Sequence, residues 1–205
     1  MLVVKLGGSL NRDPLLRDWL HLLAGCGGGR VVVVPGGGAF ADQVREHQAL
    51  WRFDDLAAHN MAILAMMQTA MMMQGLAPGL VPGLALATTE DDIHRVLHAG
   101  RVAVWSPAGW IREHADDMTH WGVTSDSLAA WLAAQLGASS LVLVKSCEIE
   151  AGLDLARYAE LGVLDEDFCR VAAGRRYSIE LLGKTELARM RTLLSPPDAG
   201  SAVVR

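Results

Sequence analysis

Two short apolar runs, each followed at once by adjacent glycines, constrain the fold of this chain more than any other feature. Leu2 to Val4 leads into Lys5-Leu6-Gly7-Gly8-Ser9, and Val31 to Val34 leads into Pro35-Gly36-Gly37-Gly38. Such a run is typical of a strand that is buried on both faces. Glycines at its end let successive backbone N–H groups turn toward an anion without an obstructing Cβ. The pattern therefore predicts two buried strands with an anion-binding loop after each.

Strand-like and helix-like segments alternate along the rest of the chain. The patterns predict helices over about 13–25, 40–49, 55–74, 91–98, 124–136 and 186–194, and strands over 84–87, 102–105, 141–144, 177–182 and 201–204. On the longest of these helices, Leu56, Ile63, Met66, Met67 and Ala70 form the expected buried side. Such alternation is typical of α/β proteins in which a mainly parallel sheet lies between helices. The 205 residues show no break in composition, so we expect one domain over 1–205.

Charge, hydropathy and cysteine usage exclude several classes of function. A net charge of −5 argues against a nucleic-acid binder, which would show a basic face. The Met-rich stretch from Met61 to Met73 is interrupted by Gln68 and is shorter than the roughly 20 apolar residues that span a bilayer, so no membrane association is expected. The three cysteines have no metal-ligand spacing and fit a reducing cytoplasm, so a cytoplasmic location and no metal site are predicted.

Lys5 and Asp126 stand at positions that suit phosphate chemistry. Lys5 precedes the first glycine pair and supplies a mobile positive charge for a phosphate in transfer. Asp126 lies in Thr124-Ser125-Asp126-Ser127, which opens a predicted helix, and Lys145 ends the predicted strand before Ser146. Ligands gather at the carboxyl ends of parallel strands. Two anion-binding loops in one fold indicate one phosphate donor and one phosphate acceptor.

Taken in order, these motifs resemble the amino acid kinase superfamily. The matching pieces are Lys-Leu-Gly-Gly-Ser, Pro-Gly-Gly-Gly and the segment from Thr124 to Ala133 before a strand that ends in lysine. The resemblance implies a three-layer αβα sandwich with a mainly parallel central sheet that transfers the terminal phosphate of ATP, with Mg²⁺, to a small acceptor. The acceptor-binding part would cover roughly 1–120 and the nucleotide-binding part roughly 121–205.

Within the superfamily, three segments are most similar to the small kinases of methanofuran biosynthesis. They are Gly36 to Asp42, His59 to Met66 and Trp121 to Ser127. Those kinases convert aminomethylfuranmethanol phosphate to its diphosphate, so the resemblance implies a small phosphorylated acceptor of this kind. A nucleotide or isoprenoid monophosphate kinase, or an oxyanion-binding protein without turnover, is the alternative, and a homo-oligomer is expected.

The resemblance also implies a role for each site residue. Lys5, Asp126 and Lys145 would be catalytic, with Asp126 organising the lysines. The donor phosphates would contact Gly7, Gly8, Ser9, Lys145 and Ser146, and the acceptor would contact Gly36, Gly37, Gly38, Asp42, His59, Thr124 and Ser125.

Several assignments have an ordinary alternative. Lys145-Ser146-Cys147-Glu148 replaces the aspartate-rich loop of longer members, so Lys145 either replaces a second catalytic lysine or is a simple strand-end charge. His59 is either a substrate contact or a packing residue, and Asp42 either pairs with a substrate ammonium or is a solvated helix charge. Trp105, Trp110 and Trp121 either shape the acceptor pocket or belong to the core.

Overall fold

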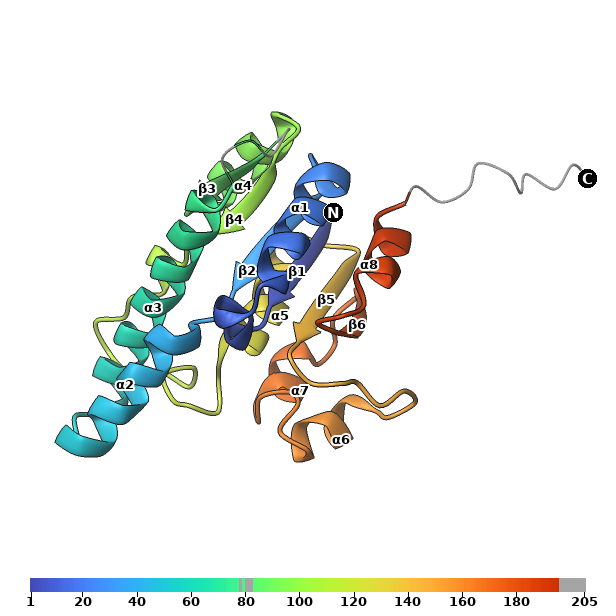
Figure 1. Cartoon of the computed structure of the whole chain (residues 1–205). Helices are drawn as coiled ribbons and strands as arrows, with labels where there is room; N and C mark the ends of the chain where they lie inside the picture. Colours follow the sequence, from blue (N-terminus) through green and yellow to red (C-terminus); the bar gives the residue numbers. More distant parts are fainter. Residues whose placement is uncertain (78, 80–82, 196–205) are drawn as a thin grey trace, which may run out of the picture.

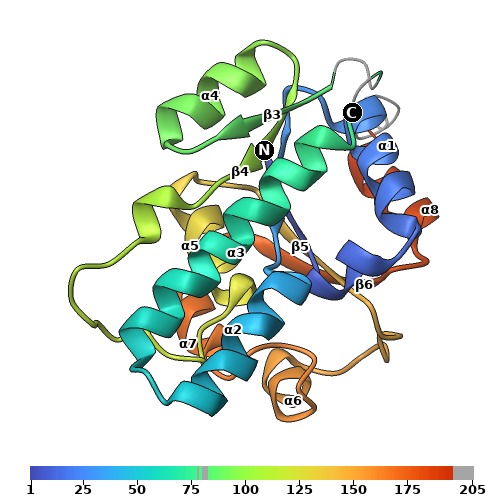
Figure 2. The ribbon, with the colours of Figure 1, turned by 60° about the vertical axis from the view of Figure 1, so that its left-hand side comes forward.

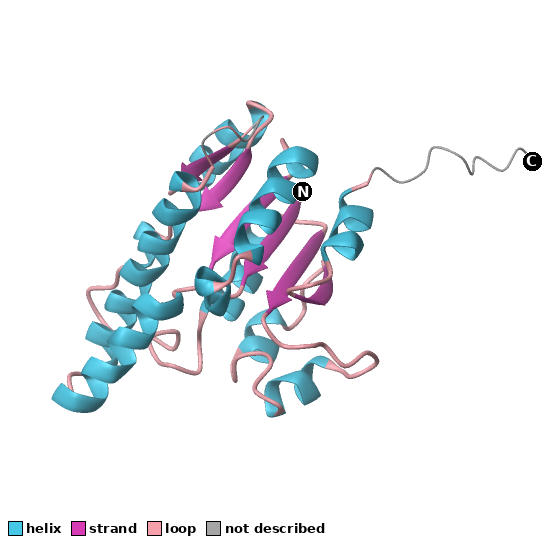
Figure 3. Ribbon diagram, viewed as in Figure 1, coloured by secondary structure: helices cyan, strands magenta, loops and turns pink. Residues whose placement is uncertain are grey.

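A six-stranded sheet forms the centre of this computed structural model, which describes residues 1–77, 79 and 83–195 (Figures 1 and 3). The strands are ordered β3-β4-β2-β1-β5-β6, and every pairing is parallel. Their bounds are β1 Leu2–Leu6, β2 Val31–Pro35, β3 Leu84–Ala87, β4 Val102–Trp105, β5 Ser140–Lys145 and β6 Ser178–Gly183. The predicted α/β sandwich with a mainly parallel sheet is confirmed. β1 and β2 lie side by side at its centre, so both glycine loops leave the same edge.

Helices cover both faces of the sheet. The helices are α1 Leu15–Gly27, α2 Gly38–Trp51, α3 Asp55–Gly75, α4 Glu90–His98, α5 Ser125–Gln135, α6 Leu155–Glu160, α7 Phe168–Ala172 and α8 Leu187–Leu194, with 3₁₀ helices η1 Gly8–Arg12 and η2 Ala108–Trp110. α1 and α8 pack on one face, and α4, α5 and α7 pack on the other. α2 packs along α3 (Figure 2). Apolar burial on both faces explains why β1 and β2 lack the alternation of a half-exposed strand.

Some predicted boundaries and faces are wrong in detail. α1 continues through Gly25 and ends at Gly27, within the glycines expected to terminate it, but it begins at Leu15 rather than at Asp13. Leu56 and Met67, expected on the buried side of α3, are only half-buried. The short helices α6 and α7 were not predicted, because neither has a full amphipathic period. The strand predicted over 201–204 lies outside the described residues.

α3 packs against the sheet and against α2, although its length and composition would also allow it to cross a membrane. The helix has 21 residues, and an 18-residue window within it has a mean hydropathy of 1.2 and is 44% buried. Ile63 and Met66 belong to one core, and Ala70 and Met73 belong to the other. These contacts give α3 a packing role at the junction of the two cores.

Candidate active site

The two glycine loops are in direct backbone contact at the carboxyl edge of the sheet. A Cβ built on Gly8 would lie 2.4 Å from the nitrogen of Gly38, and one built on Gly36 would lie 2.4 Å from the nitrogen of Gly8. Gly38 also has a φ of +56°, a conformation that side chains with a Cβ rarely adopt. The glycines are therefore required by the approach of one loop to the other.

Backbone hydrogen bonds fix these loops to the strands and leave some N–H groups free. The N–H of Gly7 donates to the carbonyl of Val144 at 3.0 Å, and the N–H of Gly36 donates to the carbonyl of Leu6 at 2.9 Å. Among the described residues, the N–H groups of Gly8, Gly37 and Gly38 have no such acceptor. They lie at the starts of η1 and α2, where N–H groups lack a partner within the helix and favour an anion.

Lys5, Asp126 and Lys145 form a buried ionic cluster next to these loops. Lys5 comes from β1, Asp126 from the first turn of α5, and Lys145 from the end of β5. Nζ of Lys5 lies 2.7 Å from Oδ1 of Asp126, and Nζ of Lys145 donates to Oδ2 of the same carboxylate. The side chains are 6%, 4% and 12% exposed, respectively. All three were predicted site residues, and the structure brings them together.

The charges in this cluster shift the pKa values of two of its members. Burial alone would raise the pKa of Asp126, but the ammonium groups of Lys5 and Lys145 hold it below its ordinary value. Burial, together with repulsion from Lys5, lowers the pKa of Lys145, and Asp126 only partly offsets this. Two ammonium groups share one carboxylate, so the cluster carries an excess positive charge that suits a phosphoryl group.

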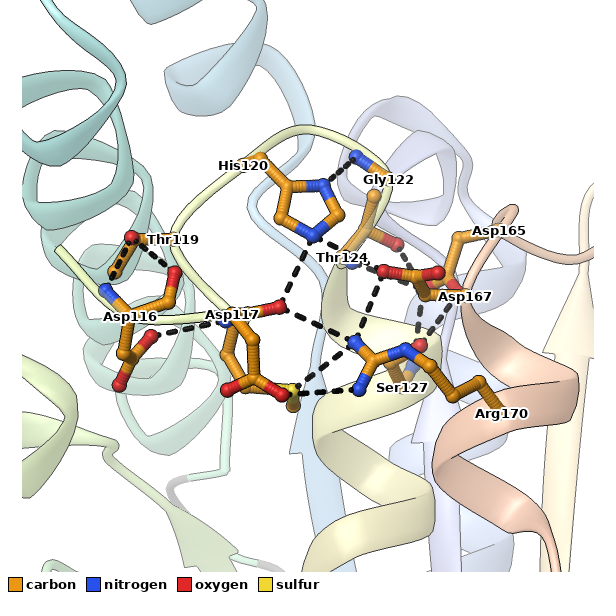
Figure 4. A network of polar contacts seen from close by, with 11 residues as sticks. Asp116, Asp117, Thr119, His120, Gly122, Thr124, Ser127, Asp165, Asp167 and Arg170 are labelled. Atoms are coloured by element: carbon orange, nitrogen blue, oxygen red, sulfur yellow. Dashed lines mark hydrogen bonds and ion pairs between the residues drawn. The ribbon is translucent and has the colours of Figure 1, made fainter.

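Asp165, in the loop between α6 and α7, holds the first turn of α5. Its Oδ2 accepts hydrogen bonds from the N–H and hydroxyl of Thr124, both at 2.9 Å, and from the N–H of Ser127 at 3.0 Å (Figure 4). Its Oδ1 accepts from the hydroxyl of Ser127 at 2.5 Å. Asp165 was not predicted, because no local motif relates it to a helix so far away in the chain.

A second polar network holds the loop that precedes α5. Nε2 of His120 lies 3.0 Å from a carboxylate oxygen of Asp167, and its Nδ1 accepts from the N–H of Gly122. Arg170 of α7 contacts Asp167 and also Asp117 (Figure 4). These contacts tie the loop to α7, so that His120 faces a neighbouring cavity.

This cavity, with a volume of about 250 Å³, lies between the glycine loops, α2, α3 and the start of α5. Eight of the predicted site residues line it: Gly8, Ser9, Gly37, Gly38, Asp42, His59, Thr124 and Ser125. Trp121, which the sequence left open between pocket and core, also lines it, and so does Arg45, which was not predicted and lies three residues past the matching segment Gly36 to Asp42. Lys145 and Ser146 are outside the lining, at the end of β5. Residues from both the predicted acceptor-binding part and the predicted nucleotide-binding part of the chain line the cavity.

The predicted residues on α2 and α3 have partners within the protein. Asp42 forms an exposed ion pair with Arg45 at 3.1 Å, and the guanidinium of Arg45 lies 4.3 Å from the centre of the Trp121 ring. Nε2 of His59 lies 3.2 Å from the carbonyl of Trp110, so this nitrogen carries the proton. Burial lowers the pKa of His59, which favours the neutral ring.

The sequence left open whether Trp105, Trp110 and Trp121 shape the acceptor pocket or belong to the core, and the structure separates them. Trp105 and Trp110 are buried and pack against Trp131, with ring centres 6.5 and 4.8 Å away, so both belong to the core. Trp121 is half-buried, lines the cavity and donates from its indole N–H to Gln48 at 2.6 Å. Only Trp121 therefore shapes the pocket directly.

The residues present fit a polyphosphate better than a protein-held metal. Lys5, Lys145 and the free N–H groups of the glycine loops all favour phosphate oxygens. Within the described ranges, no group of at least three histidine, cysteine or acidic side chains is placed to hold a metal ion. A Mg²⁺ ion brought by ATP would thus be held largely by phosphates and water.

Comparisons with known proteins agree with this geometry. A sequence model of the amino acid kinase family matches residues 1–148. The chain is 29% identical over 146 residues to a [5-(aminomethyl)furan-3-yl]methyl phosphate kinase of Methanocaldococcus jannaschii, and the match covers 70% of this chain but only 64% of the relative. The chain therefore spans less than two thirds of the length of that relative.

Solved structures share the fold at low sequence identity. The uridylate kinase of Archaeoglobus fulgidus is similar with a TM-score of 0.69 at 15% identity, covering 94% of each chain. The UMP kinase of Ureaplasma parvum has a TM-score of 0.67 at 14% identity, covering 89% of this chain and 88% of its own. The aspartate kinase of Synechocystis has a TM-score of 0.68 at 15% identity, covering 89% of this chain and 37% of its own.

Proposed function

The chain belongs to the amino acid kinase family, and from this premise we propose that it is an ATP-dependent phosphotransferase for a small phosphorylated acceptor. The observation that carries the proposal is the buried Lys5–Asp126–Lys145 cluster beside the two touching glycine loops. A binding protein without turnover has no need for two ammonium groups held by one carboxylate. Phosphoryl transfer does need them, since catalysis there consists mostly of positioning and of charge stabilisation.

In this proposal each member of the cluster has a distinct role. Lys5 stabilises the negative charge on the phosphoryl group as it moves between donor and acceptor. Lys145, at the end of β5, binds the donor phosphates together with Ser146. Asp126 accepts no proton, because its pKa is held low, and it keeps both ammonium groups in place. The N–H groups of Gly8 and Ser9, which line the cavity, would contact the donor phosphates.

The cavity would bind the acceptor. The free N–H groups of Gly37 and Gly38 at the start of α2 suit its phosphate. Thr124, Ser125, His59 and Asp42 also line the cavity and would contact the rest of the acceptor. We propose aminomethylfuranmethanol phosphate as the acceptor and its diphosphate as the product, a choice supported by the matching segments and by the printed activity of the relative from Methanocaldococcus jannaschii.

A comparison of acceptors tests this function. Purified protein is incubated with ATP, Mg²⁺ and either aminomethylfuranmethanol phosphate, uridylate or isopentenyl phosphate, and ADP release is followed for each. We expect the highest kcat/KM for the furan. A kinetic preference for uridylate or isopentenyl phosphate would overturn the acceptor but not the phosphotransfer. Tight binding of ATP with no ADP release in any mixture would favour an oxyanion-binding protein. A homo-oligomer and a cytoplasmic location remain predictions, which size-exclusion chromatography and cell fractionation test.

A further inference from the structure

We propose that Asp165 is a positioning residue of the active site, which fixes the first turn of α5 and thereby holds the carboxylate of Asp126 between Lys5 and Lys145. The inference rests on the proposed function, because it concerns how the same ionic cluster is kept in its working geometry. Asp165 itself contacts neither lysine directly, and it lies outside the lining of the cavity.

Asp165 accepts hydrogen bonds from residues on both sides of Asp126 in the chain. Thr124 and Ser127, the donors to Asp165, lie two residues before and one residue after Asp126 in the chain. Ser127 is fully buried, so water does not replace its bonds to Asp165, whereas Thr124 and Asp165 are half-buried. A carboxylate that receives four hydrogen bonds from one helical turn fixes that turn in place.

The helix cannot provide the same restraint from its own N-cap. The hydroxyl of Thr124 donates to Asp165, and as an acceptor it lies 3.5 Å from the N–H of Asp126, at the limit of a hydrogen bond. The N-terminus of α5 therefore depends on a carboxylate from another part of the chain. Loss of that carboxylate would allow Asp126 to shift relative to β1 and β5, and a shift of about 1 Å is enough to slow an aligned reaction severely.

Asp165 also acts on Lys145 through its charge. The charged groups that face Lys145 are Asp126 from α5, Lys5 from β1 and Asp165 from the loop before α7. The two carboxylates raise the pKa of Lys145, while burial and Lys5 lower it by more. Removing the charge of Asp165 should thus lower the pKa of Lys145 further. A displacement of Asp126 away from Lys145 would change this pKa in the same direction, because Asp126 also raises it.

Kinetics on two variants and a matched control test the positioning. Asp165→Asn keeps the shape but removes the charge, and Ser127→Ala removes one hydrogen bond from the helix side while keeping Asp165. The control, Asp154→Asn, makes the same change at the exposed cap of α6. We expect kcat to fall at least about tenfold in Asp165→Asn and less in Ser127→Ala, with KM for ATP within about threefold of wild type in both. Wild-type kcat in either variant, with an unchanged melting temperature, would overturn the proposal.

A titration that needs no turnover separates this proposal from the proposed function. Protein labelled with ¹³C at the lysine side chains is titrated by NMR, and the Lys145 signal is identified from its loss in Lys145→Arg. The midpoint of Lys145 should move to lower pH in Asp165→Asn and stay at the wild-type value in Ser127→Ala and Asp154→Asn. An unmoved midpoint in Asp165→Asn would overturn the role of Asp165, whether or not any acceptor is phosphorylated. Absence of ADP with every acceptor would overturn the function and leave this titration valid.

Discussion

Replacing Lys5 by methionine should abolish most turnover and leave the protein folded. The thioether side chain has a similar length, so Lys5→Met removes the charge with little change in packing. Lys5 is buried, and its only ion-pair partner within the described ranges is Asp126. Asp126 keeps its contact with Lys145 in the variant, so no uncompensated buried carboxylate remains.

The structure gives the size of the effect on stability. At the 2.7 Å between Nζ of Lys5 and Oδ1 of Asp126, attraction between unit charges is about 6 kcal/mol at an effective dielectric constant of about 20. Burying the ammonium costs several kcal/mol, and its repulsion with Lys145 also disappears in the variant. These contributions offset one another, so we expect the free energy of unfolding to change by less than about 2 kcal/mol. By contrast, Asp126→Asn leaves two buried ammonium groups without a carboxylate and should cost about 3 to 5 kcal/mol.

The effect on catalysis should be much larger than the effect on stability. Losing one preorganised charge at the phosphoryl group costs about 3 to 4 kcal/mol in the transition state, or roughly two to three orders of magnitude in kcat. Urea unfolding and ADP release, measured on the same preparations of wild type, Lys5→Met and Asp126→Asn, check both expectations. A folded Lys5→Met protein with near-normal turnover would refute the catalytic role. A stability loss above about 4 kcal/mol in Lys5→Met would show instead that the lysine is structural.

Further predictions concern a glycine pair and two pH effects. Gly8→Ala should destabilise the protein by at least about 2 kcal/mol in urea unfolding, since its Cβ would lie 2.4 Å from the nitrogen of Gly38. Gly25→Ala, where nothing lies within 4 Å, should instead stabilise α1 by about 0.5 to 1 kcal/mol. If Lys145 acts as an ammonium, kcat should fall as pH rises through a pKa below the ordinary lysine value. Lys145→Arg should move this fall in kcat to higher pH. A kcat that stays constant at alkaline pH in the wild type would contradict the assignment. The pKa of Asp126 is lower in the folded protein than in the unfolded chain, so its stabilising contribution should be complete above the unfolded-state pKa and lost as pH falls through the folded-state pKa. Asp126→Asn should remove this part of the acid dependence of stability, measured by urea unfolding.

The sequence predicted the features that local patterns determine. The buried strands β1 and β2 were found because parallel strands covered on both faces read as uninterrupted apolar runs. Lys5, Asp126 and Lys145 were found because each stands at the end of a strand or the start of a helix, and the parallel topology then brings such ends together. The structure places the three in contact; their catalytic roles stay predictions.

Features that depend on distant pairing were not found. Nothing near Asp165 in the chain indicates that it binds Thr124 and Ser127, since only the fold brings α5 and the loop before α7 together. The sequence did not indicate that the two glycine loops touch, with Gly8 and Gly38 lining the same cavity, and their division into donor and acceptor sites stays a prediction. The N–H groups of Gly7 and Gly36 are used to fix the loops, a detail that depends on strand register.

The most direct test of the account follows the phosphoryl group itself. ³¹P NMR of a mixture of protein, ATP, Mg²⁺ and aminomethylfuranmethanol phosphate reports both nucleotide and product in one spectrum. The account predicts that the γ-phosphate signal of ATP decreases as the two coupled signals of a diphosphate ester appear, and that both changes are lost in Lys5→Met. Diphosphate formed by Lys5→Met at the wild-type rate, or ATP converted only to ADP and free phosphate by the wild-type protein, would contradict it.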